Sequence, residues 1–183
     1  MLSAIFMIIV LAMHGMPPKD FPEKEKMEFM RLHSQHARPG ALTAEQMKRH
    51  AELDVQMRAW PRTETNDAFH AASCRIAAEM KKINGVEVLV AFNEFCAPGV
   101  PETLDKAAGL KQGEVVVATP MLTRGGSHAE LEIPADIEKA RQRHPGVQFR
   151  YAWPFDSAFV AKFLSEQIQR STAHSDFIFS PKK

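Results

Sequence analysis

The feature that most constrains the fold is a largely apolar run near the start of the chain, residues 2–13. Its centre, residues 5–11, reads IFMIIVL and is rich in β-branched side chains. A segment that is apolar on both faces is typical of a strand in the middle of a parallel sheet, between two layers of helices. The run is also shorter than the roughly 20 residues that a membrane-spanning helix needs. We therefore interpret it as a first, central, parallel strand.

The same run has the length of a signal-peptide core, but its flanks do not fit that function. No Lys or Arg precedes it, and no small-residue cleavage site lies between it and Lys19. The chain has two cysteines, Cys74 and Cys96, and neither belongs to a CxxC motif. We therefore expect a protein of the reducing cytoplasm, without a disulfide framework and without membrane association.

Three further short runs have the composition of strands, at residues 86–92, 114–119 and 147–153. Amphipathic stretches with apolar residues at helical spacing lie around them, at residues 67–82, 101–110, 134–143 and 157–170. Strands that alternate with helices predict βαβ units. The predicted fold class is α/β, a three-layer α/β/α domain with a four-stranded parallel sheet. We expect this single domain to cover residues 1–170, followed by a flexible tail over residues 171–183.

A long polar segment, at about residues 17–65, separates the first strand from its helix and far exceeds an ordinary βα loop. It contains two stretches of helical pattern, 23–36 and 43–60, and Thr43 is a suitable N-cap for the second. We expect a helical insertion that forms a hairpin or lid over the top of the sheet. We interpret the histidines of the insertion and its border as surface residues: His33, His36, His50 and His70.

Two histidines and a glutamate follow the ends of predicted strands. His14 follows the first strand, Glu94 follows the second, and His128 lies in the loop after the third. Ligands of doubly wound sheets bind outside the carboxyl ends of the strands, so we expect these side chains to lie close together. Two imidazoles and a carboxylate are suitable ligands for a first-row divalent ion. Each residue alone also has an ordinary explanation, as a polar strand exit, a helix cap or the partner of a lysine.

The composition and the absence of motifs exclude several functions. The formal net charge of +1 gives no overall attraction to nucleic acid or to an anionic membrane. The chain contains no GxSxG, P-loop or GxGxxG motif, so serine hydrolases, NTPases and dinucleotide-dependent oxidoreductases lack their usual signatures. A turn at residues 125–127 has the composition of an anion-binding helix entry, which by itself is weak evidence.

Three stretches resemble sirohydrochlorin chelatases of the short CbiX type. Residues 10–15, VLAMHG, are similar to the family's strand-end His-Gly, and residues 89–94, LVAFNE, resemble its strand ending in Phe-x-Glu. Residues 119–134, TPMLTRGGSHAELEIP, resemble the second signature, in which a glycine-flanked His precedes an acidic-Ile-Pro helix start. The resemblance covers residues 5–16 and about 67–168. It departs from the family where Met16 replaces a small hydroxyl residue, where Glu132 replaces Asp, and in the insertion, which minimal members lack.

The resemblance implies a chelatase, a lyase that inserts Co²⁺, Ni²⁺ or Fe²⁺ into sirohydrochlorin or a related tetrapyrrole. It implies that His14 and His128 hold the metal and accept pyrrolic protons, with Glu94 as a second base or a metal-orienting carboxylate. The metal is a substrate, and no organic cofactor is expected. The substrate's peripheral carboxylates would meet the loop formed by Arg124, Gly125, Gly126 and Ser127.

The resemblance also implies a homodimer, because chelatases of this kind commonly close two similar lobes on the macrocycle. This chain has four predicted strands and no internal repeat, enough for one lobe. Three alternatives stay open. The insertion could replace the second lobe in a monomer, the protein could bind metal or tetrapyrrole without turnover, or it could be a flavodoxin-like signalling or phosphate-binding module in which neither histidine has a role.

Overall fold

Four parallel strands form the sheet of the computed structural model, which describes residues 7–36, 38, 40–110 and 113–173. The strand order is β2-β1-β3-β4. The strands are β1 (Met7–Met13), β2 (Glu87–Phe92), β3 (Glu114–Ala118) and β4 (Gln148–Tyr151). Strand β1 pairs with both β2 and β3, which confirms that the apolar run supplies a central parallel strand. Residues 2–6 of that run lie outside the described residues.

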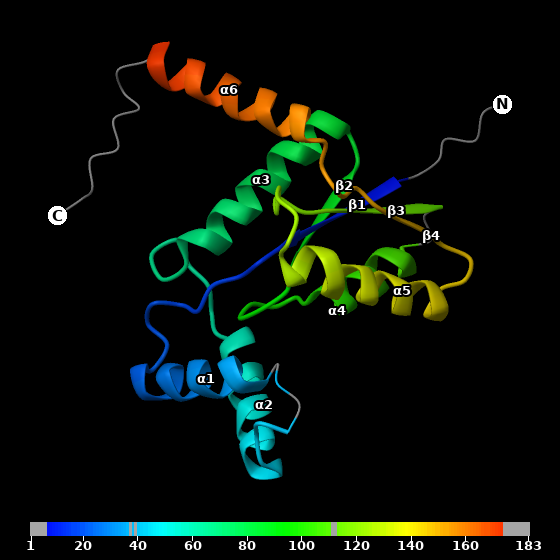
Figure 1. Cartoon of the computed structure of the whole chain (residues 1–183). Coiled ribbons are helices and arrows are strands. Elements are labelled where there is room, and N and C mark those ends of the chain that lie inside the picture. Colours follow the sequence, from blue (N-terminus) through cyan, green and yellow to red (C-terminus); the bar gives the residue numbers. More distant parts are fainter. Residues whose placement is uncertain (1–6, 37, 39, 111–112, 174–183) are drawn as a thin grey trace.

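Six α-helices accompany the sheet in the described part of the chain, and Figure 1 shows α3 on one side of it and α4 with α5 on the other. Their bounds are α1 (Glu23–His36), α2 (Ala44–Arg58), α3 (Ala68–Asn84), α4 (Val100–Gly109), α5 (Ile133–Arg143) and α6 (Ser157–Ala173). A short π-helical turn, η1 (His128–Glu132), precedes α5. The predicted α/β/α class is therefore confirmed.

The alternation of side chains along β1 builds two cores at once. Ile8, Val10 and Ala12 pack in the core that α4 and α5 complete. Ile9 and Leu11 belong to the core on the opposite face, which α3 covers. Because both faces are buried, the strand carries no polar side chain, and the first polar residue after it is His14, at its carboxyl end.

The insertion folds as the predicted helical hairpin of α1 and α2 (Figure 1). Thr43 caps α2 in a capping box, because its Oγ1 accepts from the Gln46 N–H at 3.2 Å while the Gln46 side chain accepts from the Thr43 N–H at 2.9 Å. The hairpin has its own apolar core, whose members include Phe29 and Leu53. That core also takes in Phe95 from the loop after β2. The hairpin therefore rests on the carboxyl end of the sheet.

Arg62 fastens this arrangement from the interior. Its guanidinium pairs with Asp67 at 2.6 Å, and the two side chains are only 6% and 1% exposed. It also donates to the carbonyls of Met16 and Met57 at 2.8 Å, and to the carbonyl of Phe95. One side chain thus joins the loop after β1, the end of α2, the loop after β2 and the start of α3.

Helix α6 differs from the other five helices because none of its residues is buried. It carries large exposed apolar side chains at helical spacing: Phe159, Phe163, Leu164 and Ile168. Figure 1 shows it extending away from the sheet, and it ends at Ala173, three residues beyond the predicted end. Residues 174–183 of the predicted tail lie outside the described residues. No helix in the described ranges is both long enough and apolar enough to cross a membrane.

Candidate metal centre

The three candidate residues come from three adjacent elements at one edge of the sheet. His14 directly follows β1, Glu94 follows β2, and His128 opens η1 after the loop from β3. Backbone hydrogen bonds of 2.9 Å, from Asn93 N to Met13 O and from Glu94 N to His14 O, hold the first two segments side by side. The prediction that the carboxyl ends of the strands would bring these side chains together is confirmed.

The backbone conformation and the close packing at position 15 require a glycine after His14. The φ of +103° at Gly15 is a conformation that side chains with a Cβ rarely adopt. A Cβ at this position would lie 1.9 Å from the carbonyl oxygen of Glu94, well inside contact distance. The His-Gly pair therefore allows the loop after β1 to touch the backbone that carries Glu94.

The ligand atoms of His14, Glu94 and His128 all lie within 4.8 Å of one another. The Nε2 atoms of His14 and His128 lie 3.8 Å and 3.5 Å from the two carboxylate oxygens of Glu94. The two imidazole rings stand almost perpendicular, at 85°, with centroids 4.8 Å apart. We call these three residues the metal triad.

Hydrogen bonds at the far side of each ring determine which nitrogen is available to a metal. Nδ1 of His14 lies 2.8 Å from the carbonyl of Gly15, and Nδ1 of His128 lies 2.8 Å from a carboxylate oxygen of Glu132. Both partners only accept, so each Nδ1 carries the proton and each neutral ring keeps a lone pair on Nε2. Two lone pairs then face the Glu94 carboxylate, an arrangement that a divalent cation between them would stabilise.

Two histidines of the insertion also lie at this site, and interpreting them as surface residues was wrong. Nε2 of His33 lies 3.2 Å from Glu94 Oε1, and Nδ1 of His33 lies 3.1 Å from Nε2 of His50. Both rings stack on Phe29, and His50 is only 7% exposed. The i, i+4 spacing of Phe29 and His33 was the available signal, because it places both on the inner face of α1.

The other histidines of this group lie outside the metal triad. His36 is exposed and stacks on the His50 ring with centroids 4.5 Å apart. His70 stacks on Phe92, with centroids 5.2 Å apart, and its Nδ1 lies 3.9 Å from the sulfur of Cys74. Of the four histidines predicted to be surface residues, only His36 is exposed; His33 and His70 are part-buried and His50 is buried.

The electrostatics of the site favour an ionised Glu94. Burial raises the pKa of its carboxyl, but the hydrogen bond from His33 and the nearby imidazoles outweigh burial and hold that pKa below its ordinary value. The same hydrogen bond raises the pKa of His33. Burial, together with the neighbouring His36 and His33, lowers the pKa of His50. These opposite shifts make His33 the more basic of the two stacked imidazoles.

The predicted substrate loop leads into the metal triad through His128. Arg124 is exposed, bonds Glu130 at 3.0 Å and lies over the Trp153 ring at 5.6 Å. Gly125 has a φ of +94°, which allows the turn, whereas Gly126 and Ser127 continue the chain to η1. A pocket of about 410 Å³ lies beside Arg124, between this loop and α6.

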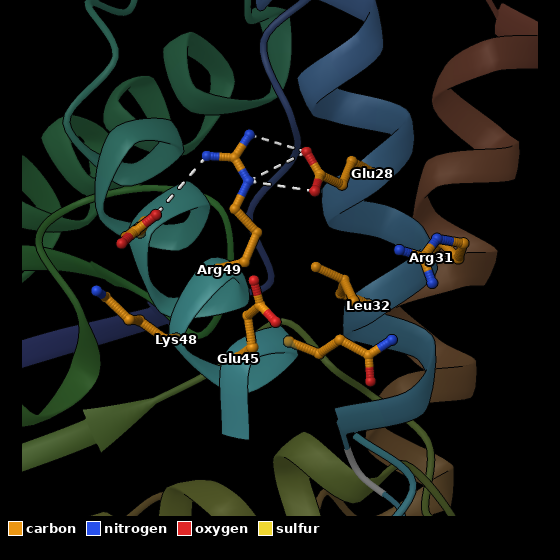
Figure 2. A pocket seen from close by; sticks show the side chains of 8 residues that line it. Glu28, Arg31, Leu32, Glu45, Lys48 and Arg49 are labelled. Atoms are coloured by element: carbon orange, nitrogen blue, oxygen red, sulfur yellow. Dashed lines mark hydrogen bonds and ion pairs between the residues drawn. The ribbon is translucent and has the colours of Figure 1, made fainter. Parts of the chain in front are cut away.

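Two other pockets are lined wholly or partly by the insertion. The first, shown in Figure 2, lies between α1 and α2, where Arg49 binds Glu28 with hydrogen bonds of 2.8 and 3.2 Å. Its acidic and basic side chains compensate one another, and no member of the metal triad lines it. The second has a volume of about 300 Å³ and reaches Glu132, the partner of His128. Its other charged lining residues are Asp54, Arg58, Glu102 and Asp136.

Comparison with known proteins identifies the family. Sirohydrochlorin cobaltochelatase from Priestia megaterium is 36% identical over 63 residues, which are 34% of this chain and 20% of that protein. The aligned part thus spans only a fifth of that relative's length.

Two solved structures are similar to this chain at TM-scores that carry no weight in the assignment. One is the sirohydrochlorin chelatase SirB from Bacillus subtilis subspecies spizizenii, in complex with cobalt. The match covers 90% of this chain and 50% of the SirB chain, at 15% identity and a TM-score of 0.45. A protein described as a cobalamin biosynthesis CbiX protein, from Marinobacter aquaeolei VT8, matches 90% of this chain and 99% of its own at 17% identity and a TM-score of 0.43.

The family model for CbiX matches residues 62–171. This segment contains Glu94 and His128, while His14 and the hairpin helices precede it. The resemblance noted in the sequence is thereby confirmed. Because the match extends over more than half of the chain, this protein belongs to the CbiX family.

Proposed function

We propose that this chain is a sirohydrochlorin chelatase that inserts Co²⁺ into the tetrapyrrole. The observation that carries the proposal is the metal triad, in which two Nε2 atoms with fixed tautomers face an ionised carboxylate. Family membership supports the reaction, and the name of the Priestia megaterium relative supports cobalt. Imidazole also suits Ni²⁺ and Fe²⁺, so these metals belong in the same assay.

The chain's residues fit the two tasks of metal insertion. The first is to present the ion, which His14, His128 and Glu94 do from an edge of the sheet open to solvent. The second is to accept the protons that leave two pyrrole nitrogens as the cation replaces them. Glu94 and the two triad imidazoles are bases within reach of an ion held between them, and they pass those protons to solvent.

The surroundings support the delivery of both substrates. The pocket beside Glu132 is lined by four carboxylates and one guanidinium, which raises the local concentration of divalent cations. On the other side of His128, the exposed Arg124 and the amides of residues 125–127 suit the peripheral carboxylates of sirohydrochlorin. No organic cofactor enters this scheme, because the metal is a substrate.

A second copy of the chain would complete the enzyme. Helix α6 has an apolar face that no described part of the chain covers, and the pocket of about 410 Å³ beside it is lined by Val160 and Leu164. We propose that this face forms part of a homodimer interface and that the macrocycle lies between two lobes.

Both cysteines are free thiols, which agrees with a protein of the cytoplasm.

Light scattering tests the assembly. A mass of about 41 kDa, twice the 20.5 kDa of one chain, is expected. A fully active species of 20.5 kDa would contradict the dimer.

A spectroscopic assay with purified protein tests the function. Sirohydrochlorin is mixed with Co²⁺, and the change in its absorption spectrum is compared with the rate without protein. We expect the His14→Ala and His128→Ala variants to lose the acceleration, while His144→Ala, outside the triad, retains it. Stoichiometric binding without turnover would show a metal or tetrapyrrole carrier instead. Wild-type rates in the His14→Ala variant would refute the site.

A further inference from the structure

Of the three imidazoles around Glu94, the nearest is His33 of the insertion and not either histidine of the metal triad. His33 Nε2 lies 3.2 Å from Glu94 Oε1, compared with 3.5 Å for His128 and 3.8 Å for His14. His33 is also the only one of the three imidazoles that makes a hydrogen bond with this carboxylate in the structure. The α1–α2 hairpin therefore reaches the metal triad through one side chain.

A second imidazole fixes the orientation of the first. Because His33 Nε2 donates to the carboxylate, Nδ1 of a neutral His33 accepts from Nε2 of His50 at 3.1 Å. If His33 is protonated, it donates in both directions and His50 accepts. In either state the His33 ring has a partner at each nitrogen and cannot flip without losing both hydrogen bonds.

The two rings are also held by packing. Phe29 is completely buried and stacks on His33 and His50, with centroids 5.1 Å and 5.0 Å away. Phe95 packs against His33 from the loop that carries Glu94, with centroids 5.6 Å apart. Burying an imidazole beside aromatic rings is unfavourable unless its nitrogens are hydrogen-bonded. For His33, Glu94 satisfies this requirement at Nε2 and His50 satisfies it at Nδ1.

We propose that His33, supported by His50, is a positioning residue that holds the carboxylate of Glu94 in its metal-binding orientation. This inference rests on the proposed function only in taking the metal triad as the place where the ion binds. Glu94 Oε2 faces His14 while Oε1 is held by His33, so the carboxylate cannot turn away from the triad. The insertion is thus part of the metal site as well as a cover over the sheet.

Co²⁺ binding without tetrapyrrole tests this inference. The dissociation constant is measured by calorimetry and by the visible absorption of the bound ion. His33→Phe keeps a ring against Phe29 but removes the hydrogen bond, and we expect about 10- to 100-fold weaker binding, as for other supporting partners of metal ligands. His33→Gln keeps an N–H at the same distance from the backbone and should restore most of the affinity. A purely structural role would predict no such rescue.

His144 offers a matched control. It bonds Asp105 at 2.7 Å, and its side chain is 30% exposed, compared with 29% for His33. His144→Phe should bind Co²⁺ as the wild type does. Thermal unfolding of every variant establishes that each is folded at the temperature of the titration.

The outcomes separate this inference from the proposed function. Unchanged Co²⁺ affinity and spectrum in folded His33→Phe would overturn the positioning role, even if the wild type inserts cobalt. Weakened binding that His33→Gln restores would support the role, even if no sirohydrochlorin is metallated. A wild-type protein that binds no Co²⁺ would overturn both.

Discussion

Replacing Arg62 with Met should destabilise the protein severely, because the change leaves a carboxylate buried without its partner. Asp67 is only 1% exposed and loses the guanidinium that lies 2.6 Å away. Removing one member of a buried ion pair costs about 3–5 kcal/mol. The carbonyl of Phe95 also loses its donor, whereas that of Met57 keeps the Trp60 N–H at 3.2 Å.

The magnitude translates into a measurable shift in melting temperature. For a chain of 150–250 residues, each kcal/mol corresponds to about 2–4 °C, so the Arg62→Met variant should melt roughly 6–20 °C below the wild type. Circular dichroism at 222 nm follows the transition, and urea unfolding gives the free energy. Arg75→Met is the control, since its pair with Glu64 is exposed and is expected to contribute about 0–1 kcal/mol.

A double variant isolates the cause. Arg62→Met combined with Asp67→Asn removes both charges, while Asn keeps the cap that Asp67 provides to the His70 N–H at 2.9 Å. The double variant should therefore be more stable than Arg62→Met alone. A melting temperature of Arg62→Met within about 2 °C of the wild type, the shift expected for less than 1 kcal/mol, would refute this reasoning. No recovery in the double variant would show that packing, and not the buried charge, dominates.

Three further outcomes are expected. Gly15→Ala should lower the unfolding free energy by about 1–3 kcal/mol and weaken Co²⁺ binding, because the new Cβ meets the Glu94 carbonyl; wild-type binding would contradict this. A thiol reagent at pH 8 should modify the exposed Cys74 first and the buried Cys96 only on unfolding, since burial raises the Cys96 pKa to about 11. Stability from the His33–Glu94 pair should be largest between pH 4.5 and 6.5, the ordinary pKa values of the two groups. It falls in acid, where the carboxylate is protonated, and declines as pH rises through the raised pKa of His33, so a wild-type advantage over His33→Phe that stays constant from well below pH 4.5 to well above pH 6.5 would exclude the linkage.

The strands and helices were predictable from local patterns because their burial follows the short periods of the chain. Helix α1 begins and ends where its pattern predicted, at Glu23 and His36, and the Thr43 cap predicted the start of α2. The metal triad was predictable for a related reason, since the ends of parallel strands meet at one edge whatever lies between them. No detail of side-chain packing was needed to place His14 near Glu94.

The sequence spacing could place His33 on the same face of α1 as Phe29, but it could not show that this face meets Glu94. The position of His33 relative to Glu94 depends on how the hairpin rests on the sheet, and long-range contacts set that orientation. Phe95 adopts a positive φ of 61°, rare for a large side chain, and its ring enters the hairpin core. Arg62 secures the same junction through three backbone carbonyls. Nothing in the sequence spacing of Phe95 or Arg62 indicates these contacts.

The place of the insertion in the chain makes its role at the site a consequence of topology. The insertion leaves the sheet just after His14 and returns at the start of α3, so both of its ends lie at the carboxyl edge of the strands. A hairpin attached there has to pack on the loops that carry the metal triad. A wholly apolar inner face would stabilise the packing but could not orient a carboxylate. Helices α1 and α2 instead place two hydrogen-bonded imidazoles in that face. Because His33 makes a hydrogen bond with Glu94, the packing of the hairpin and the orientation of the carboxylate are determined by the same contacts.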